Sequence, residues 1–120
     1  MSHVFDLTDE TLAQALAGPL PLLIDFTASW CPPCRAIAPH VEAVAAAHAG
    51  RLRVARCDVD EQTAIAARYD VRAMPTLLLI DRGLVAGVIV GAVPRAKIEA
   101  LVAKLPQPRN VSGLESNRVL

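Results

Sequence analysis

The chain has 120 residues, of which 53% are hydrophobic and 20% are charged, and its formal net charge is zero. This length suits one domain with its own hydrophobic core. The cations are spread along the chain without a basic patch, which argues against nucleic-acid binding because that function normally needs a basic face. The longest apolar stretch, residues 83–93, is too short to span a bilayer.

The N-terminus and the cysteine content both bear on where the protein works. The first residues lack the cationic region followed by an apolar run that marks a signal peptide. Three cysteines, an odd number, fit a reducing compartment better than a secreted scaffold held together by disulfides. We therefore expect a cytoplasmic protein with no membrane partner, and we expect it to be a monomer.

The first part of the chain predicts a strand, a short helix and a second strand. Residues 4–7 can form a short edge strand, and Thr8 or Asp9 offers an N-cap for the helix that follows. Residues 22–27 are a nearly continuous apolar run. Such a run is typical of a strand that is buried on both faces, in a parallel or mixed sheet covered by helices.

Asp25 is the only charged residue in this apolar run. Burying a carboxylate is costly unless it is paired, and burial raises the pKa by disfavouring the charged form. The run leads directly to two cysteines, so we expect Asp25 to exchange a proton with the second of them, Cys34, directly or through water. The alternative is an exposed position at a strand end, which the apolar neighbours Ile24 and Phe26 disfavour.

The segment Trp30-Cys31-Pro32-Pro33-Cys34-Arg35 follows this strand. Two cysteines separated by two residues can form a disulfide only where the backbone turns tightly, and Pro33 suits the first turn of a helix. The free N–H groups and the dipole of that helix would favour a thiolate at Cys31, which lowers the pKa of this thiol and makes it nucleophilic. Cys34, one turn later, would be less exposed. The pattern predicts Cys31 as the attacking thiol and Cys34 as the resolving thiol.

Two other uses of the cysteine pair are disfavoured. Structural zinc needs a second pair of ligands, and neither Cys57 nor the three histidines offer one at matching spacing. A purely structural disulfide would close so small a loop that it would remove little entropy from the unfolded chain. We therefore expect redox chemistry, with no metal.

The middle of the chain predicts a helix, a strand and a second helix. The first helix begins at Pro33, and Pro39 should kink it because proline has no N–H to donate. Residues 52–58 read as a strand in which Cys57 is a small core residue. Residues 61–69 form an alanine-rich helical segment.

The last part of the chain predicts a hairpin and a final helix. Pro75 must occupy the first position of the strand over residues 76–80, because proline cannot pair inside a central strand. Residues 81–83 are a turn signal into a strand over residues 84–90. A helix begins at Pro94.

Taken together, these elements predict an α/β domain with a central mixed sheet of about five strands and about four helices on its two faces. We assign this domain to residues 1–105. Residues 106–120 are less hydrophobic and contain two prolines, so we separate them as a C-terminal tail of unknown role.

The hexapeptide Trp30-Cys31-Pro32-Pro33-Cys34-Arg35 resembles the active-site motif of the thioredoxin family. The resemblance extends without evident gaps from Asp6 to Leu105, which makes it far more specific than a lone pair of cysteines. Pro32 departs from the glycine of the commonest members, and Thr27 departs from a tryptophan that most members carry. The positions that match the family's buried aspartate, cis-proline loop and two later glycines are Asp25, Met74-Pro75-Thr76, Gly83 and Gly91.

This resemblance implies a thioredoxin-like fold and a thiol–disulfide oxidoreductase. Cys31 would attack a substrate disulfide, Cys34 would displace the reduced substrate and close the Cys31–Cys34 disulfide, and Asp25 would accept the proton of Cys34. The family implies disulfide-containing protein substrates, and it implies an NADPH-dependent thioredoxin reductase as the electron donor. We expect no bound cofactor.

The resemblance also implies a surface for the substrate chain. The backbone of Met74, next to Pro75, would hold that chain extended beside Cys31. Arg56 occupies the position of a lysine that lies near the buried aspartate in thioredoxins, so it is a candidate modulator of Asp25; the alternative is a surface cation at a strand edge. The apolar surface around Cys31 would consist of Trp30, Pro32, Pro33, Ala73, Gly91 and Ala92.

Two alternative functions stay open at this point. One is a partner-specific reductase or weak oxidant, like the tryparedoxins or the thioredoxin-like proteins of cytochrome maturation, which also carry Cys-Pro-Pro-Cys. The other is a thioredoxin fold that serves as a binding module or holdase. Binding alone needs none of Cys31, Cys34, Asp25 and Pro75, so their joint presence favours the enzyme.

Overall fold

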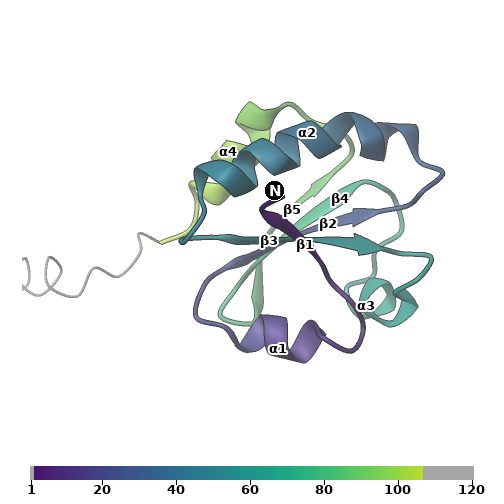
Figure 1. Ribbon diagram of the computed structural model, residues 1–120, viewed down its shortest axis with the longest axis horizontal. Coiled ribbons are helices and arrows are strands. Elements are labelled where there is room, and N and C mark those ends of the chain that lie inside the picture. Colours follow the sequence, from purple (N-terminus) through teal and green to yellow (C-terminus); the bar gives the residue numbers. More distant parts are fainter. Residues whose placement is uncertain (1, 107–120) are drawn as a thin grey trace, which may run out of the picture.

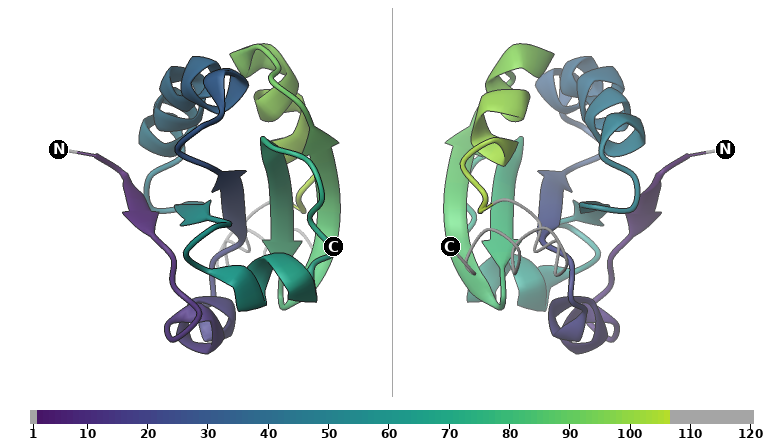
Figure 2. Two further views of the ribbon diagram at one scale, coloured as in Figure 1. Left: turned by 90° about the vertical axis from the view of Figure 1, so that its right-hand side faces the viewer. Right: turned by 90° about the vertical axis from the view of Figure 1, so that its left-hand side faces the viewer.

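A mixed sheet lies between two layers of helices (Figures 1 and 2). The computed structural model describes residues 2–106, so the predicted tail lies outside the described residues after Pro106. The order of the elements is the predicted one. They are β1 (Val4–Asp6), α1 (Leu12–Ala17), β2 (Leu22–Thr27), α2 (Pro32–Ala47), β3 (Arg53–Asp58), α3 (Thr63–Arg68), β4 (Thr76–Asp81), β5 (Leu84–Val90) and α4 (Arg95–Val102).

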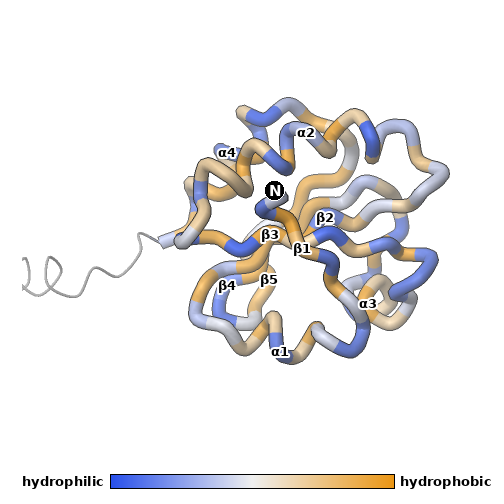
Figure 3. The backbone as a smooth tube through the Cα atoms, in the orientation of Figure 1, coloured by the Kyte–Doolittle hydropathy of each residue, from blue (hydrophilic) through white to orange (hydrophobic). Residues whose placement is uncertain are grey.

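The sheet has five strands in the order β1-β3-β2-β4-β5. β3 pairs in parallel with β1 and β2, while β4 pairs antiparallel with β2 and β5. β2 is therefore the central strand, and its residues 22–26 are all buried, as the apolar run predicts. Figure 3 shows hydrophobic residues along the strands and hydrophilic ones mainly on the outer helices and loops.

Successive residues of β2 point to opposite faces of the sheet, so this strand contributes to two cores. Leu23 packs with Ile37 of α2 and Ile98 of α4 on one face. Phe26 lies in the second core, between the sheet and the layer of α1 and α3. Asp25 shares the face of Leu23, and it therefore faces α2, the helix that begins at the cysteines.

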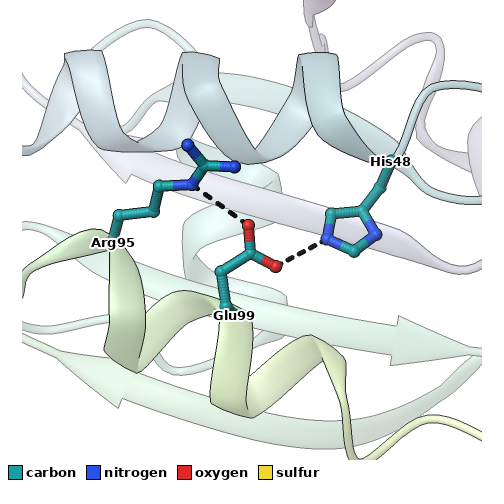
Figure 4. A network of polar contacts seen from close by, with 3 residues as sticks. All are labelled: His48, Arg95 and Glu99. Carbon is teal, nitrogen blue, oxygen red and sulfur yellow. Dashed lines mark hydrogen bonds and ion pairs between the residues drawn. The ribbon is translucent and has the colours of Figure 1, made fainter.

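A polar bridge joins the far end of α2 to α4 (Figure 4). His48 Nε2 lies 2.6 Å from Glu99 Oε1, and Arg95 Nε donates to Glu99 Oε2 at 3.1 Å. The hydrogen bond with His48 is the largest of the effects that hold the pKa of Glu99 below its usual value. The bridge helps to fix the position of α2 at the end opposite the cysteines.

The predicted N-cap of α1 is only partly confirmed. The helix begins after Thr11, which makes no capping hydrogen bond through its side chain. Asp9 instead accepts a hydrogen bond from the backbone N–H of Ile65 at 3.0 Å, so it caps the first turn of α3. Thr8 makes a capping-type pair one turn earlier: its hydroxyl accepts from the N–H of Thr11 at 3.2 Å, and the Thr11 hydroxyl accepts from the N–H of Thr8 at 3.1 Å. The contact between Asp9 and Ile65, by contrast, forms only in the folded chain.

The hairpin between β4 and β5 has the predicted position. Its two loop residues, Arg82 and Gly83, have φ values of 53° and 80°. Positive φ at both residues is the geometry of a type I′ turn, whose twist matches that of antiparallel strands.

Pro39 lies inside α2, which continues through it, and the helix begins at Pro32, one residue earlier than predicted. In the described residues, no helix is long and apolar enough to cross a membrane.

Gly87→Ala should destabilise the fold. A Cβ added to Gly87 in β5 would overlap the side chain of Leu101 in α4, which is buried against the sheet. Overpacking of this kind costs about 1–3 kcal/mol of unfolding free energy. Urea unfolding of Gly87→Ala, Leu101→Ala and the double variant measures it. The cost of the glycine substitution should largely vanish in the Leu101→Ala background, and an unchanged cost would show that the overlap is not its cause.

Candidate active site

The start of α2 holds both sulfurs of the site. Cys31 is the N-cap residue, and it forms a disulfide with Cys34 across a Cα–Cα distance of 5.3 Å. Pro32 and Pro33 occupy the first two helical positions and have no N–H groups. The backbone N–H of Cys34 is thus the first that the helix can offer, and it donates to Cys31 Sγ at 3.2 Å. This donor favours negative charge on Cys31.

The predicted difference in exposure between the two cysteines is absent in this disulfide form. Cys31 is 2% exposed and Cys34 is 3% exposed. Ala28 packs with both of them, and Met74 covers the same cluster from the loop before β4. The prediction that Cys34 is less exposed than Cys31 is therefore wrong for the oxidised state, because residues distant in sequence also close over Cys31.

The loop before β4 brings its backbone to the disulfide. The Met74–Pro75 peptide bond is cis, and the carbonyl oxygen of Met74 lies 3.7 Å from Cys31 Sγ. The N–H of Gly91 donates to the carbonyl oxygen of Pro75 at 2.8 Å, which ties the end of β5 to this loop. The structure therefore brings Met74 to Cys31 and joins Gly91 to Pro75 in the same loop.

The residues of the predicted apolar surface differ in exposure. Trp30 is 62% exposed, while Pro75 is buried and cannot be part of a contact surface through its ring. The indole N–H of Trp30 donates to Asp60 Oδ2 at 2.8 Å, which fixes the ring beside the disulfide. The sequence did not predict the role of Asp60. Asp60 lies 30 residues after Trp30, with α2 and β3 between them, and no local pattern links the two side chains. The remaining exposed members of the surface are Pro32, Pro33, Ala73 and Ala92.

Asp25 is buried, as predicted, and is 1% exposed. Its Oδ1 atom has no hydrogen-bond partner among the described residues. Burial raises the pKa of Asp25 from 3.8 to about 6, and the Arg56 guanidinium opposes this rise by favouring the carboxylate. Arg56 is the register neighbour of Asp25 on β3, so both side chains leave the same face of the sheet.

Arg56 does not pair directly with Asp25 in the described part of the chain. Its Nη2 atom lies 3.5 Å from Glu42 Oε2, on α2. The hydroxyl of Ser2 donates to the same Glu42 oxygen at 2.7 Å. Arg56 is therefore close enough to influence Asp25, but its ionic partner is a residue that the sequence did not single out.

Comparison with known proteins decides the family. The thioredoxin family model matches residues 3–104. The chain belongs to the thioredoxin family. It is 42% identical to a thioredoxin of Streptomyces clavuligerus over 105 residues, which cover 87% of this chain and 94% of that protein. It is 36% identical to thioredoxin 1 of Nostoc sp. over 105 residues, which cover 87% of this chain and 98% of that protein.

Family membership and the Cys31–Cys34 pair together give the activity. This thioredoxin is a thiol–disulfide oxidoreductase that reduces protein disulfides through a dithiol–disulfide cycle. The matches do not favour the partner-specific enzyme or the binding module. Among the described residues, no group of three or more histidine, cysteine or acidic side chains is placed to hold a metal ion.

A cavity of about 280 Å³ lies beside Cys34. Thr27 stands where most family members carry a tryptophan, and its smaller side chain is part of the cavity wall together with Cys34 and Arg56. Its volume admits water, for which Thr27, Ser29 and Asp58 in its wall offer polar groups. A larger cavity of about 600 Å³ includes His48 and Glu99 in its wall but neither active-site cysteine.

Cys57 is a small core residue, as predicted. It is fully buried and free, and it lies in the core on the face of α1 and α3, opposite to that of Asp25. Burial raises the pKa of the Cys57 thiol to about 12, with smaller contributions from Asp9 and Asp58. A thiol with such a pKa is a poor nucleophile near neutral pH.

Proposed function

We propose that this thioredoxin reduces its substrates in two steps, with Cys31 as the attacking thiol and Cys34 as the resolving thiol. The observation that carries this assignment is the N-cap geometry. The first N–H of α2 points at Cys31 Sγ and not at Cys34 Sγ. Because this donor stabilises a thiolate, Cys31 is the more nucleophilic sulfur in the reduced protein.

In the first step, the Cys31 thiolate attacks one sulfur of the substrate disulfide. A bond forms between Cys31 Sγ and that sulfur, the substrate disulfide breaks, and the other substrate sulfur leaves as a thiolate. The carbonyl oxygen of Met74, which lies 3.7 Å from Cys31 Sγ, marks a backbone alongside which an extended substrate chain can lie. Trp30 and the neighbouring prolines give that chain an exposed apolar surface.

In the second step, Cys34 attacks Cys31 Sγ. The Cys31–Cys34 disulfide forms, the mixed disulfide breaks, and the second substrate thiolate leaves, so two electrons pass from the dithiol to the substrate. Cys34 must lose a proton to attack. Asp25 can accept it, because it faces the helix that carries Cys34 and a pKa of about 6 is near neutral pH. The cavity beside Cys34 can admit water, although Asp25 is not part of its wall.

The wider setting is also part of the proposal. An NADPH-dependent thioredoxin reductase would return two electrons to the Cys31–Cys34 disulfide, as the family membership suggests. The free thiol of Cys57 suits a reducing compartment such as the cytoplasm. We propose a monomer of one thioredoxin domain, with residues 1–105 as that domain.

Insulin reduction tests the proposal. With dithiothreitol supplied, the wild-type protein should reduce insulin disulfides much faster than dithiothreitol alone. Cys31→Ser should fall to the rate of dithiothreitol alone, because the attacking sulfur is gone. Cys57→Ala is the matched control, since it removes a cysteine from the other face of the sheet, and it should keep the wild-type rate. Wild-type activity no faster than dithiothreitol would overturn the proposal.

A further inference from the structure

Arg56 has two anionic neighbours on one face of the sheet. It sits beside Asp25 in the register of β2 and β3, and its guanidinium lies within 3.5 Å of Glu42 on the helix that covers this face. No ion pair joins Arg56 to Asp25 in the part of the chain that the structure describes. The Arg56 guanidinium is thus paired with the carboxylate of Glu42, although the buried carboxylate of Asp25 has an oxygen without a partner among the described residues.

Glu42 is itself fixed from the other side. The Ser2 hydroxyl donates to Glu42 Oε2 at 2.7 Å, and Ser2 also bonds to the backbone of Val4 at the start of β1. Glu42 is therefore tied both to the N-terminal strand and to Arg56. These contacts hold the carboxylate of Glu42 between the Ser2 hydroxyl and the Arg56 guanidinium.

We propose that Glu42 is a positioning residue for substrate release: it anchors the Arg56 guanidinium away from Asp25 and thereby keeps Asp25 a strong enough base to take the proton of Cys34. This inference rests on the proposed role of Asp25 as the proton acceptor. It gives Arg56, which was a candidate modulator, a defined mode of action. The cation favours ionised Asp25, and Glu42 limits that effect.

The other charged groups on this face do not replace Glu42. Arg35 comes from α2, but it is engaged with the carbonyl oxygen of Ser29 at 3.0 Å. Asp58 lies farther along β3 and accepts from the backbone N–H of Asp60 at 2.9 Å. Asp6 is the register neighbour of Arg56 on β1, at the outer edge of the sheet. Cys34 is the remaining titratable group, and β4 contributes Leu77 opposite Asp25.

The geometry fixes the sign of the expected changes. Glu42→Gln removes a negative charge and frees Arg56 to turn toward the unpartnered oxygen of Asp25, and both effects lower the pKa of Asp25. Arg56→Gln removes the cation and should raise it. Glu42 and Arg56 have side chains that are 37% and 32% exposed, so screening limits the effect. We expect opposite shifts of roughly 0.3–0.7 pH units.

Carboxyl NMR titration of Asp25 in the oxidised protein measures these shifts without any assay of activity. The double variant Glu42→Gln, Arg56→Gln shows whether Glu42 acts through Arg56. If it does, Glu42→Gln should have little further effect once Arg56 is absent. Glu99→Gln is the matched control, because it removes another ion-paired carboxylate, on α4 beside the far end of α2, and it should leave the Asp25 titration unchanged.

A second readout links the shift to the reaction. In a stopped-flow reaction of the reduced protein with dithiobis(nitrobenzoate), Cys34 releases the second thionitrobenzoate, and the pH midpoint of that step should move down in Glu42→Gln and up in Arg56→Gln. An unchanged NMR titration in Glu42→Gln would overturn the inference about Glu42. NMR shifts without any change in the release step would instead overturn the role proposed for Asp25. The two failures are therefore distinguishable.

Discussion

Asp25→Asn should stabilise the oxidised protein near neutral pH, by on the order of 1–3 kcal/mol of unfolding free energy. The folded protein holds the Asp25 proton more tightly than the unfolded chain does, since burial raises its pKa from 3.8 to about 6. The carboxyl group therefore contributes stability that is fully present below about pH 3.8 and is lost as the pH rises through about 6. Asparagine carries no charge, so it avoids this loss.

The upper end of the expected gain in unfolding free energy follows from the pKa shift of Asp25. A change of about two pKa units corresponds to about 3 kcal/mol, and Asp25 is only 1% exposed, so solvent screens it little. Burial of an amide with incomplete hydrogen bonding offsets part of the gain. Urea unfolding of both proteins at about pH 8 and about pH 4 tests the sign, because the advantage of the variant should be present at the higher pH and nearly absent at the lower one.

The same substitution should slow substrate release, because asparagine cannot accept the proton of Cys34. Stability and rate should therefore change together. Asp58→Asn is the matched control, since Asp58 lines the cavity beside Cys34 but lies at the end of β3 and is less buried than Asp25. A variant at Asp25 that is destabilised at neutral pH and fully active would mean that Asp25 is a paired structural carboxylate.

Cys34→Ser should abolish turnover and leave the substrate covalently attached to Cys31. The first step needs only Cys31, so the mixed disulfide forms, but no thiol in the protein is then placed to break it. With a disulfide-containing protein as substrate, the adduct should accumulate on non-reducing gels and disappear when dithiothreitol is added. Insulin reduction should fall close to the rate of dithiothreitol alone.

Two further variants make the trapping experiment specific. Cys31→Ser should form no such adduct, and Cys57→Ala combined with Cys34→Ser should form as much as Cys34→Ser alone. Peptide mapping of the adduct identifies the attached cysteine. An adduct on Cys34 in the Cys31→Ser protein, formed as fast as the one on Cys31, would contradict the assigned roles.

The order of strands and helices could be predicted from the sequence because it depends on local patterns. The apolar run of β2, the loop residues Arg82 and Gly83, and the prolines at the start of α2 each favour one backbone conformation. The position of Asp25 inside a buried strand followed from the same run. The cysteine pair and Asp25, to which most of the proposed chemistry is assigned, could therefore be predicted from the sequence.

The parts that the sequence did not predict depend on contacts between distant residues. Asp9 caps α3, Trp30 is held by Asp60, and Arg56 pairs with Glu42. None of these pairs has a local signature, because each joins two different elements of the fold. The burial of Cys31 also depends on a contact between distant residues, since the loop at Met74 covers it.

Alkylation of the reduced protein tests most directly the claim that Cys31 is the attacking thiol. Iodoacetamide should modify Cys31 first, and at a pH below that at which a free thiol reacts, because Cys31 is the sulfur that faces the first N–H of α2. Cys34 should react more slowly, and Cys57, fully buried with a pKa of about 12, slowest of all. Peptide mapping over a series of pH values reports all three rates. Faster modification of Cys34 or Cys57 than of Cys31 would contradict the account.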